Sequence, residues 1–379
     1  MQSITSLRQY DGNSYAHSCQ PSIGSSSVAY NTATPGLFRC DPVEYGAYQA
    51  VNNCMKIQKG EQVVVITDHE LSALAETICR QIAMAGAMVD KFVMEEIGSR
   101  PEDGIDPQIF PKAIEIAMSN AQASFYMAGE REGEGSSFRR PMVAAIKKHK
   151  LRHAHMPGLT REIMSQGMAA DYSQIQRLSL AIYNIVFGAK EIRVTSKAGT
   201  VAVFNFDKKY PWIVDDGDIS DGVIANLPGG EVFTVPVDAK GRVVIDGGLG
   251  DHFTAKYGLL TQHPISFELE AGRCVRGSVR CANEALRREF EKYTFETDEN
   301  SSRVGEFAIG TNIGLTKLIG NLLQDEKFPG VHIALGHPLP WVTGADWDSA
   351  VHNDAMIIKA TVIVDGRMIM KDGEFVIDY

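Results

Sequence analysis

Between residues 60 and 150, patterns typical of buried strands alternate with patterns typical of amphipathic helices. Short apolar runs are each followed by a segment in which apolar residues recur at helical spacing. Such alternation implies a parallel sheet covered by helices on both faces. The sequence therefore predicts an α/β fold for this half, with strands at 60–67, 87–95 and 123–129 and helices at 71–86, 106–121 and 139–150.

The rest of the chain has a different sequence pattern. A helical segment over about 160–188 is followed by strand and turn patterns, and Asp365-Gly366 and Asp372-Gly373 each lie between alternating apolar runs, which is a hairpin signal. We expect a polar N-terminal extension over residues 1–42, a parallel α/β domain over 43–190, and a mainly β (α+β) domain over 191–379.

Charge and cysteine usage exclude several classes of protein. A formal net charge of -10 would repel a phosphate backbone, so we expect no nucleic-acid partner. The six cysteines form no CxxC pair, which argues against a zinc ribbon and a disulfide scaffold. The first thirty residues hold no apolar run typical of a signal peptide, and no apolar stretch is long enough to span a bilayer. We therefore expect no membrane partner and a cytoplasmic location.

Ionisable side chains within apolar strands of the second half point to a cation. His352 and Asp354 are two residues apart, so an extended chain turns both to one face. This pair alone could equally be a buried hydrogen-bonded pair. Glu231 and Glu306, each directly preceded by glycine, and His332 in GVHIALG repeat the theme. Because a buried unpaired carboxylate is unfavourable, one shared divalent metal centre explains all five residues together.

These motifs resemble the thermophilic metallo-aminopeptidase family, of the aminopeptidase T and aminopeptidase S type, which is leucyl aminopeptidase-like. In that family two metals are held by a Glu in E-V-F-T-x-P, a Glu after Gly, a His in H-I/L-A-L-G, and the His and Asp of H-x-D. The resemblance implies that the metal ligands here are Glu231, Glu306, His332, His352 and Asp354. One departure is Leu339, because the family's aminopeptidases carry a Tyr at this position, seven residues after the motif His.

The resemblance also implies an activity. It predicts a homodimeric hydrolase that uses two Zn, Co or Mn ions to activate water against an amide bond of a small-molecule or short-peptide substrate. A separate group must move the proton, and the candidate catalytic residue is whichever of Glu231 and Glu306 is less tightly bound to metal.

Two other functions are compatible with the sequence. His332, His352 and one carboxylate also compose the set that holds a single iron(II) in oxygenases, and the same superfamily resembles a ring-cleaving 2,5-dihydroxypyridine dioxygenase. Alternatively, the N-terminal parallel sheet could be a non-catalytic small-molecule-binding module, with its ligand beyond the strand that ends at residues 67–70. We interpret Asp68 and His69 in that segment as strand-end structure. The number and kind of metal ions per chain distinguish the two enzymes.

Overall fold

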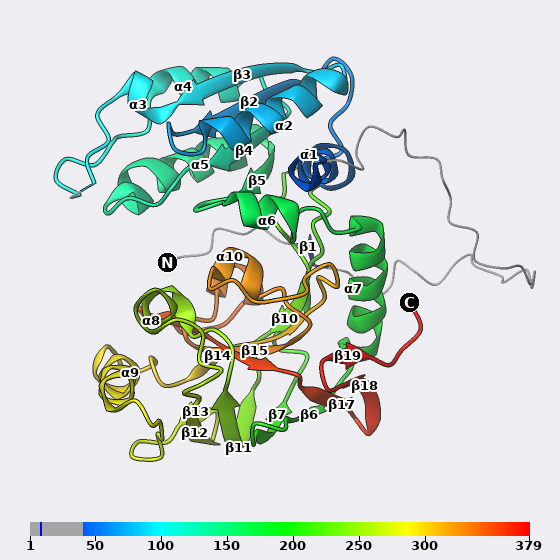
Figure 1. The fold of residues 1–379 in the computed structure, drawn as a ribbon, viewed down its shortest axis with the longest axis vertical. Coiled ribbons are helices and arrows are strands. Elements are labelled where there is room, and N and C mark those ends of the chain that lie inside the picture. Colours follow the sequence, from blue (N-terminus) through cyan, green and yellow to red (C-terminus); the bar gives the residue numbers. More distant parts are fainter. Residues whose placement is uncertain (1–7, 10–40, 103, 221) are drawn as a thin grey trace, which may run out of the picture.

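The computed structural model describes residues 8–9, 41–102, 104–220 and 222–379, and within them the strands form three sheets (Figure 1). The extension expected over residues 1–42 lies almost wholly outside the described residues. Among the residues that the structure describes, none of the helices combines the length and the apolar character that a membrane crossing requires.

The first sheet is parallel throughout and confirms the α/β prediction. Across the sheet its strands are β3 Met88–Val93, β2 Gln62–Thr67, β4 Ala123–Met127, β5 Arg152–His155 and β9 Ile224–Asn226. The helices and π-helical turns of this part are α1 Pro42–Tyr48, η1 Gln49–Cys54, α2 Ser72–Met84, α3 Met94–Ile97, α4 Lys112–Met118, η2 Gly135–Arg139, α5 Arg140–His149 and α6 Arg161–Ser165.

Alternate residues of β2 explain why helices cover both faces of this sheet. Val63 and Val65 pack with α1 and α2, whereas Val64 and Ile66 pack with α4 and α5. The helix expected over 106–121 is shorter than predicted, because Pro111 is extended and α4 begins only at Lys112. Strand β5 was not predicted, since its sequence Arg-His-Ala-His carries no apolar pattern although the strand is buried.

The helical segment expected over 160–188 is not continuous, which corrects that prediction. It consists of α6 and of α7 Tyr172–Val186. Helix α7 starts where it does because the Asp171 side chain accepts hydrogen bonds from the backbone N–H groups of Ser173 and Gln174. The strand β9, at 224–226, lies after the expected boundary near residue 190 but pairs with β5 of the parallel sheet. The position of the domain boundary therefore stays a prediction.

Two antiparallel sheets form the second half of the molecule. One contains β1 Arg8–Gln9, β8 Ile213–Asp215, β10 Glu231–Thr234, β14 Val304–Gly310, β15 Gly330–Gly336 and β16 His352–Ile358. The other contains β13 Arg273–Cys274, β12 Ile265–Glu270, β11 Asp238–Ile245, β7 Val201–Asn205, β6 Glu191–Thr195, β17 Thr361–Val364, β18 Arg367–Lys371 and β19 Glu374–Phe375. The remaining helices are α8 Gly250–Tyr257, α9 Glu284–Glu296, α10 Leu322–Asp325 and α11 Pro340–Thr343. Both predicted hairpins are confirmed, at the β17–β18 and β18–β19 turns.

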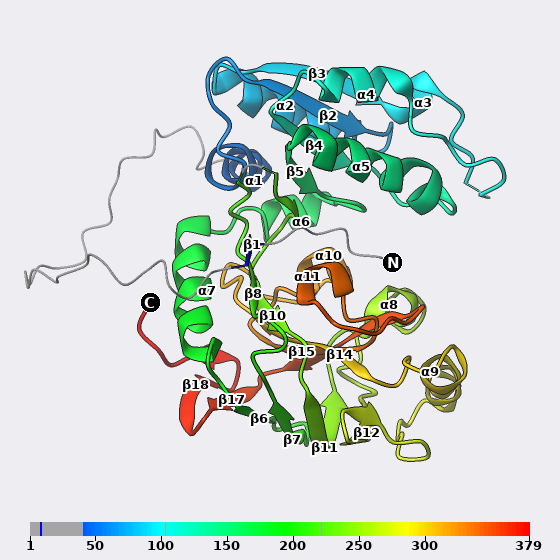
Figure 2. The same ribbon diagram turned by 180° about the vertical axis from the view of Figure 1, so that it is seen from behind.

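A shared apolar core joins these two antiparallel sheets. The six-stranded sheet contributes one face to it, through residues such as Val232, Phe307 and Ile333. Because side chains alternate along a strand, the neighbours of these residues project from the opposite face. Figures 1 and 2 show that this opposite face looks toward the parallel sheet, with α10 between the two. The space beside it is where the candidate site lies.

Candidate metal centre

The strand register of the six-stranded sheet brings together all five residues that the sequence singled out. In β14 and β15 Ala308 is opposite His332, and in β15 and β16 Ala334 is opposite Asp354. The β14 strand carries a bulge between Val304 and Glu306. As a result Glu231, Glu306, His332, His352 and Asp354 project from one face of β10, β14, β15 and β16.

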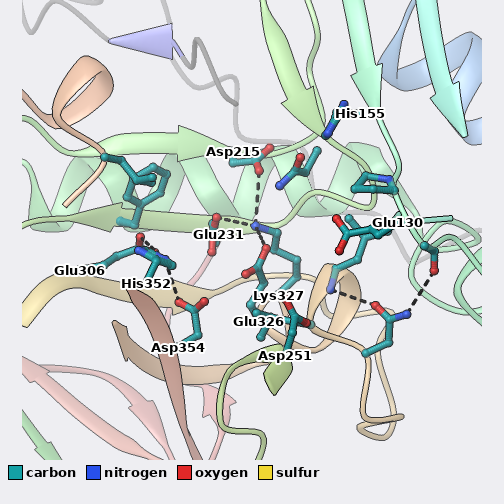
Figure 3. A pocket seen from close by; sticks show the side chains of 18 of the residues that line it. Glu130, His155, Asp215, Glu231, Asp251, Glu306, Glu326, Lys327, His352 and Asp354 are labelled. Carbon is teal, nitrogen blue, oxygen red and sulfur yellow. Dashed lines mark hydrogen bonds and ion pairs between the residues drawn. The ribbon is translucent and has the colours of Figure 1, made fainter. Parts of the chain in front are cut away.

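The five side chains form two overlapping sets of donors. Figure 3 shows four of them, Glu231, Glu306, His352 and Asp354. The first set is Glu231, Glu306 and His332, and the second is Glu306, His352 and Asp354, with the donor atoms of each set within 4.8 Å of one another. His332 Nε2 lies 3.1 Å from Glu306 Oε1 and 3.5 Å from Glu231 Oε2. His352 Nε2 lies 3.3 Å from Asp354 Oδ1 and 3.7 Å from Glu306 Oε2. Glu306 is therefore shared between two adjoining positions.

Two buried carboxylate oxygens without a hydrogen bond among the described residues indicate that the donor sets fit a metal. Glu231 Oε2 and Asp354 Oδ1 are buried and accept no hydrogen bond from the described part of the chain. Buried polar atoms are normally paired, because an unpaired one loses its interaction with water without replacement. Carboxylate oxygens and imidazole nitrogens are also the donors that divalent ions such as zinc accept. A cation between these groups would bind the two oxygens directly, whereas the described residues offer them only imidazoles at 3.5 and 3.3 Å.

The electrostatics of the site also favour positive charge. Burial alone would lower the pKa of both histidines, but the neighbouring carboxylates outweigh it and raise the pKa of His332 to about 9 and that of His352 to about 10. Burial would raise the pKa of Asp354, but the charge of His352 holds it at about 2. The acids thus dominate the local field, and a proton or a metal ion can supply the positive charge that they demand.

A second buried cluster, which the sequence analysis missed, adjoins the first. The ammonium Nζ of Lys327 lies 2.5 Å from Glu231 Oε1, 2.9 Å from Glu326 Oε1 and 3.5 Å from Asp215 Oδ2. Burial raises the pKa of Glu326 to about 8 and that of Asp215 to about 7, although the Lys327 charge opposes both shifts. The run Asp-Glu-Lys before Phe-Pro-Gly is also typical of a solvated turn, so the sequence offered no signal that these charges are buried.

A cavity of about 300 Å³ opens beside both clusters and receives residues from both halves of the molecule. Glu130, Arg139 and His155 line it from the parallel-sheet half, and Asp251 and Glu326 line it from the other half. Glu130 belongs to the acidic segment 129–135, which follows β4. The cavity is of the size that a small molecule or a short peptide occupies.

Leu339 gives this cavity an apolar wall. Its side chain is buried and packs in a small cluster with Phe233, Ala308 and Val342. The residue has φ 54°, a left-handed conformation, directly before α11. At this position the chain therefore presents only hydrocarbon to the pocket.

The strand end at residues 67–70 is closed by an arginine. Arg100 is buried and lies 2.7 Å from Asp68 Oδ2 and 2.7 Å from Glu134 Oε1. The second carboxylate oxygen of Asp68 accepts a hydrogen bond from Leu71 N–H. The structural interpretation of Asp68 agrees with these contacts, because both of its carboxylate oxygens are held within the chain.

Comparison with known proteins places this geometry in a family. A model of the family "Thermophilic metalloprotease (M29)" matches residues 186–377, just over half of the chain, which include all five donors. The structure is similar to that of 2,5-dihydroxypyridine dioxygenase from Pseudomonas putida KT2440, with TM-score 0.63, 16% identity, and coverage of 88% of this chain and 97% of that one. It is equally similar to wild-type AmpT from Thermus thermophilus, with TM-score 0.63, 20% identity, and coverage of 89% and 99%.

No curated protein matches the chain. The two solved structures support the fold alone, because their sequence identities are low. The family match has more weight, since it spans the four strands that carry the donors. The chain therefore belongs to the thermophilic metalloprotease (M29) family, a family of metal-dependent peptidases.

Proposed function

We propose that this protein is an aminopeptidase-like hydrolase with a binuclear divalent metal centre. The observation that carries the proposal is the pair of donor sets that share Glu306. Glu231, Glu306 and His332 would hold one ion, and Glu306, His352 and Asp354 the other. Two such ions supply a water of lowered pKa and polarise the carbonyl of an amide substrate.

The chain's own residues would hold this arrangement and handle the proton. Lys327 takes up Oε1 of Glu231 and leaves Oε2 for the donor set. The sequence pointed to Glu231 or Glu306 as the group that moves the proton, but both belong to the donor sets. Glu326 lines the pocket beside them, and its Oε1 is held by Lys327. We therefore assign the proton to Oε2 of Glu326 and keep Glu231 and Glu306 as ligands.

A mononuclear iron(II) dioxygenase of the 2,5-dihydroxypyridine ring-cleaving type is the second candidate. The likeness in fold to such an enzyme favours it. Leu339 does so too, because its hydrocarbon side chain stands where the resemblance to aminopeptidases implies a Tyr. The donor composition argues against it, because each set among the described residues contains one histidine and two carboxylates. Oxygenases that bind a single iron typically use two histidines and one carboxylate. The hydrolase is therefore the better supported of the two.

Metal content measured together with activity tests the proposal. We expect two Zn, Co or Mn ions per chain, with cleavage of an aminoacyl amide such as leucinamide. Glu306→Gln should lose both ions and the activity, because Glu306 belongs to both sets, whereas His352→Ala should lose one ion. Glu289→Gln is a matched control, since this acid pairs with His252 and Lys256 and belongs to neither donor set. One iron per chain with oxygen uptake on a hydroxylated pyridine would instead establish the dioxygenase.

A further inference from the structure

A chain of hydrogen bonds leads through the parallel sheet to the wall of the pocket. Ser124 Oγ on β4 lies 2.8 Å from His153 Nδ1 on β5, and His153 Nε2 lies 3.4 Å from His155 Nδ1. All three side chains are buried, and His155 lines the pocket. The His155 ring stacks on Tyr126, with 5.2 Å between the ring centroids, so its orientation is fixed. None of these residues takes part in the proposed metal centre.

The direction of this chain follows from the partners of the Ser124 hydroxyl. Within the described residues, His153 is its one hydrogen-bond partner, so the hydroxyl hydrogen is satisfied only if Ser124 donates to Nδ1. His153 then carries its hydrogen on Nε2 and donates to His155 Nδ1. His155 in turn carries its hydrogen on Nε2. Burial lowers the pKa of His153 to about 3 and that of His155 well below its ordinary value, so both rings are neutral.

The Nε2–H group of His155 is available to donate a hydrogen bond to a ligand. No described group of the protein accepts from it. Arg139 lines the same pocket, and its positive charge acts on His155. One guanidinium nitrogen of Arg139 lies 3.0 Å from Glu130 Oε1, which leaves its other N–H groups for a ligand. A neutral N–H donor beside a guanidinium is suited to bind a carboxylate.

The opposite end of the pocket has the opposite character. It holds the acids of the donor sets together with Glu326 and Asp251. In Figure 3, His155 and Glu130 lie to the right of Lys327, whereas Glu306, His352 and Asp354 lie to its left. The pocket therefore offers the donor-set acids at one end and N–H donors at the other, where the acid Glu130 is paired with Arg139. A molecule that complements both ends has an amine at one end and a carboxylate at the other.

We propose that His155 and Arg139 bind the free α-carboxylate of the substrate, so that the pocket selects dipeptide-sized substrates with an unblocked C-terminus. This inference rests on the proposed hydrolase function and names the substrate class of that site. The cavity of about 300 Å³ is at the lower end of small-molecule sites, which agrees with a short substrate. Ser124 and His153 are positioning residues, because they fix the tautomer of His155 without contact to the substrate.

The proposal is tested by comparing Leu-Gly with Leu-Gly-amide on the zinc-loaded protein. The wild type should cleave Leu-Gly with a kcat/KM about 10- to 100-fold higher, the contribution of a hydrogen bond to a charged group. His155→Phe keeps the ring that stacks on Tyr126 but removes one of the two donors, so this ratio should fall about 10-fold, while Arg139 keeps part of the preference. His155→Gln supplies an N–H at a similar place and should restore part of the preference. His252→Phe is the matched control, because His252 also stacks on a tyrosine but lies outside the pocket.

Each other outcome has a distinct meaning. Equal cleavage of Leu-Gly and Leu-Gly-amide by the wild type, or an unchanged ratio in His155→Phe, would overturn the carboxylate site and leave the hydrolase intact. Failure of every variant and of the wild type to cleave either peptide would overturn the hydrolase itself. A readout independent of activity is the ¹⁵N spectrum of histidine-labelled protein, assigned by the signals missing in His155→Phe. It should show His155 with its hydrogen on Nε2, and a hydrogen on Nδ1 would refute the donor assignment.

Discussion

Lys327 gives the buried acids of the site a positive partner within the chain. Its ammonium group lies within 3.5 Å of oxygens of Glu231, Glu326 and Asp215, and its side chain is only 1% exposed. One buried cation faces three carboxyl groups, so these acids remain short of positive charge even with Lys327 in place. Burial raises the pKa of Asp215 and Glu326, and a single ammonium group is not enough to bring both back to their ordinary values.

We predict that Lys327→Met destabilises the fold by about 3–5 kcal/mol at pH 8, because it leaves the acids buried without their cation. The loss should be smaller at pH 5. Carboxyl groups with raised pKa are protonated in the folded protein there, and their contribution to stability disappears as the pH rises through that pKa. Urea unfolding at both pH values measures this. Lys209→Met removes an exposed pair with Asp346 and should leave unfolding almost unchanged; equal effects of the two substitutions would refute the argument.

At the scale of elements, a glycine sets the position of Glu306. Gly305 lies within the β14 bulge, and a Cβ atom there would come 2.3 Å from the carbonyl oxygen of Gly336 and 2.9 Å from that of His337. Both contacts are with backbone, which cannot rotate away as a side chain can. The close approach of β14 to the end of β15 therefore requires glycine, and the bulge re-aims the next residue into the site.

We expect Gly305→Ala to lower the stability by about 1–3 kcal/mol, as overpacking does. It should also weaken zinc binding, because β14 must shift and Glu306 moves with it. Urea unfolding and zinc titration measure the two effects. Gly188→Ala provides the control, since a Cβ at Gly188 meets nothing within 4 Å and should leave both quantities unchanged. Full zinc affinity in Gly305→Ala would show that the bulge does not place Glu306.

The sequence predicted those elements of the site in which charge interrupts an apolar strand. Glu306 and His332 are noticeable for that reason, and glycine before Glu306 strengthened the signal. It did not predict Lys327, because a charged residue in a turn is usually solvated and only the tertiary fold buries it. Nor did it predict His155, because β5 is buried on both faces without an apolar pattern. The parallel sheet was predictable from local periodicity, whereas its fifth strand, β9, comes from a distant part of the chain.

At the scale of the whole molecule, the metal donors come from one half, whereas the residues that line the pocket come from both halves. All five donors lie on β10, β14, β15 and β16 of a single sheet. The pocket, in contrast, receives Arg139 and His155 from the parallel-sheet half. Metal binding should therefore stabilise the antiparallel half directly, while a substrate that reaches both ends of the pocket would also contact the parallel-sheet half.

Removal of metal tests this division. A ligand at 100 times its Kd stabilises the state that it binds by about 2.7 kcal/mol, so a chelator should lower the protection of amides in β10 and in β14–β16. Strands β2 and β4 should keep their protection, because no donor lies on them. Hydrogen exchange with and without chelator measures both, and Glu306→Gln should show no difference between the two conditions. An equal loss in all these strands would mean that the halves open as one cooperative unit, since local opening of the antiparallel half leaves the parallel sheet protected.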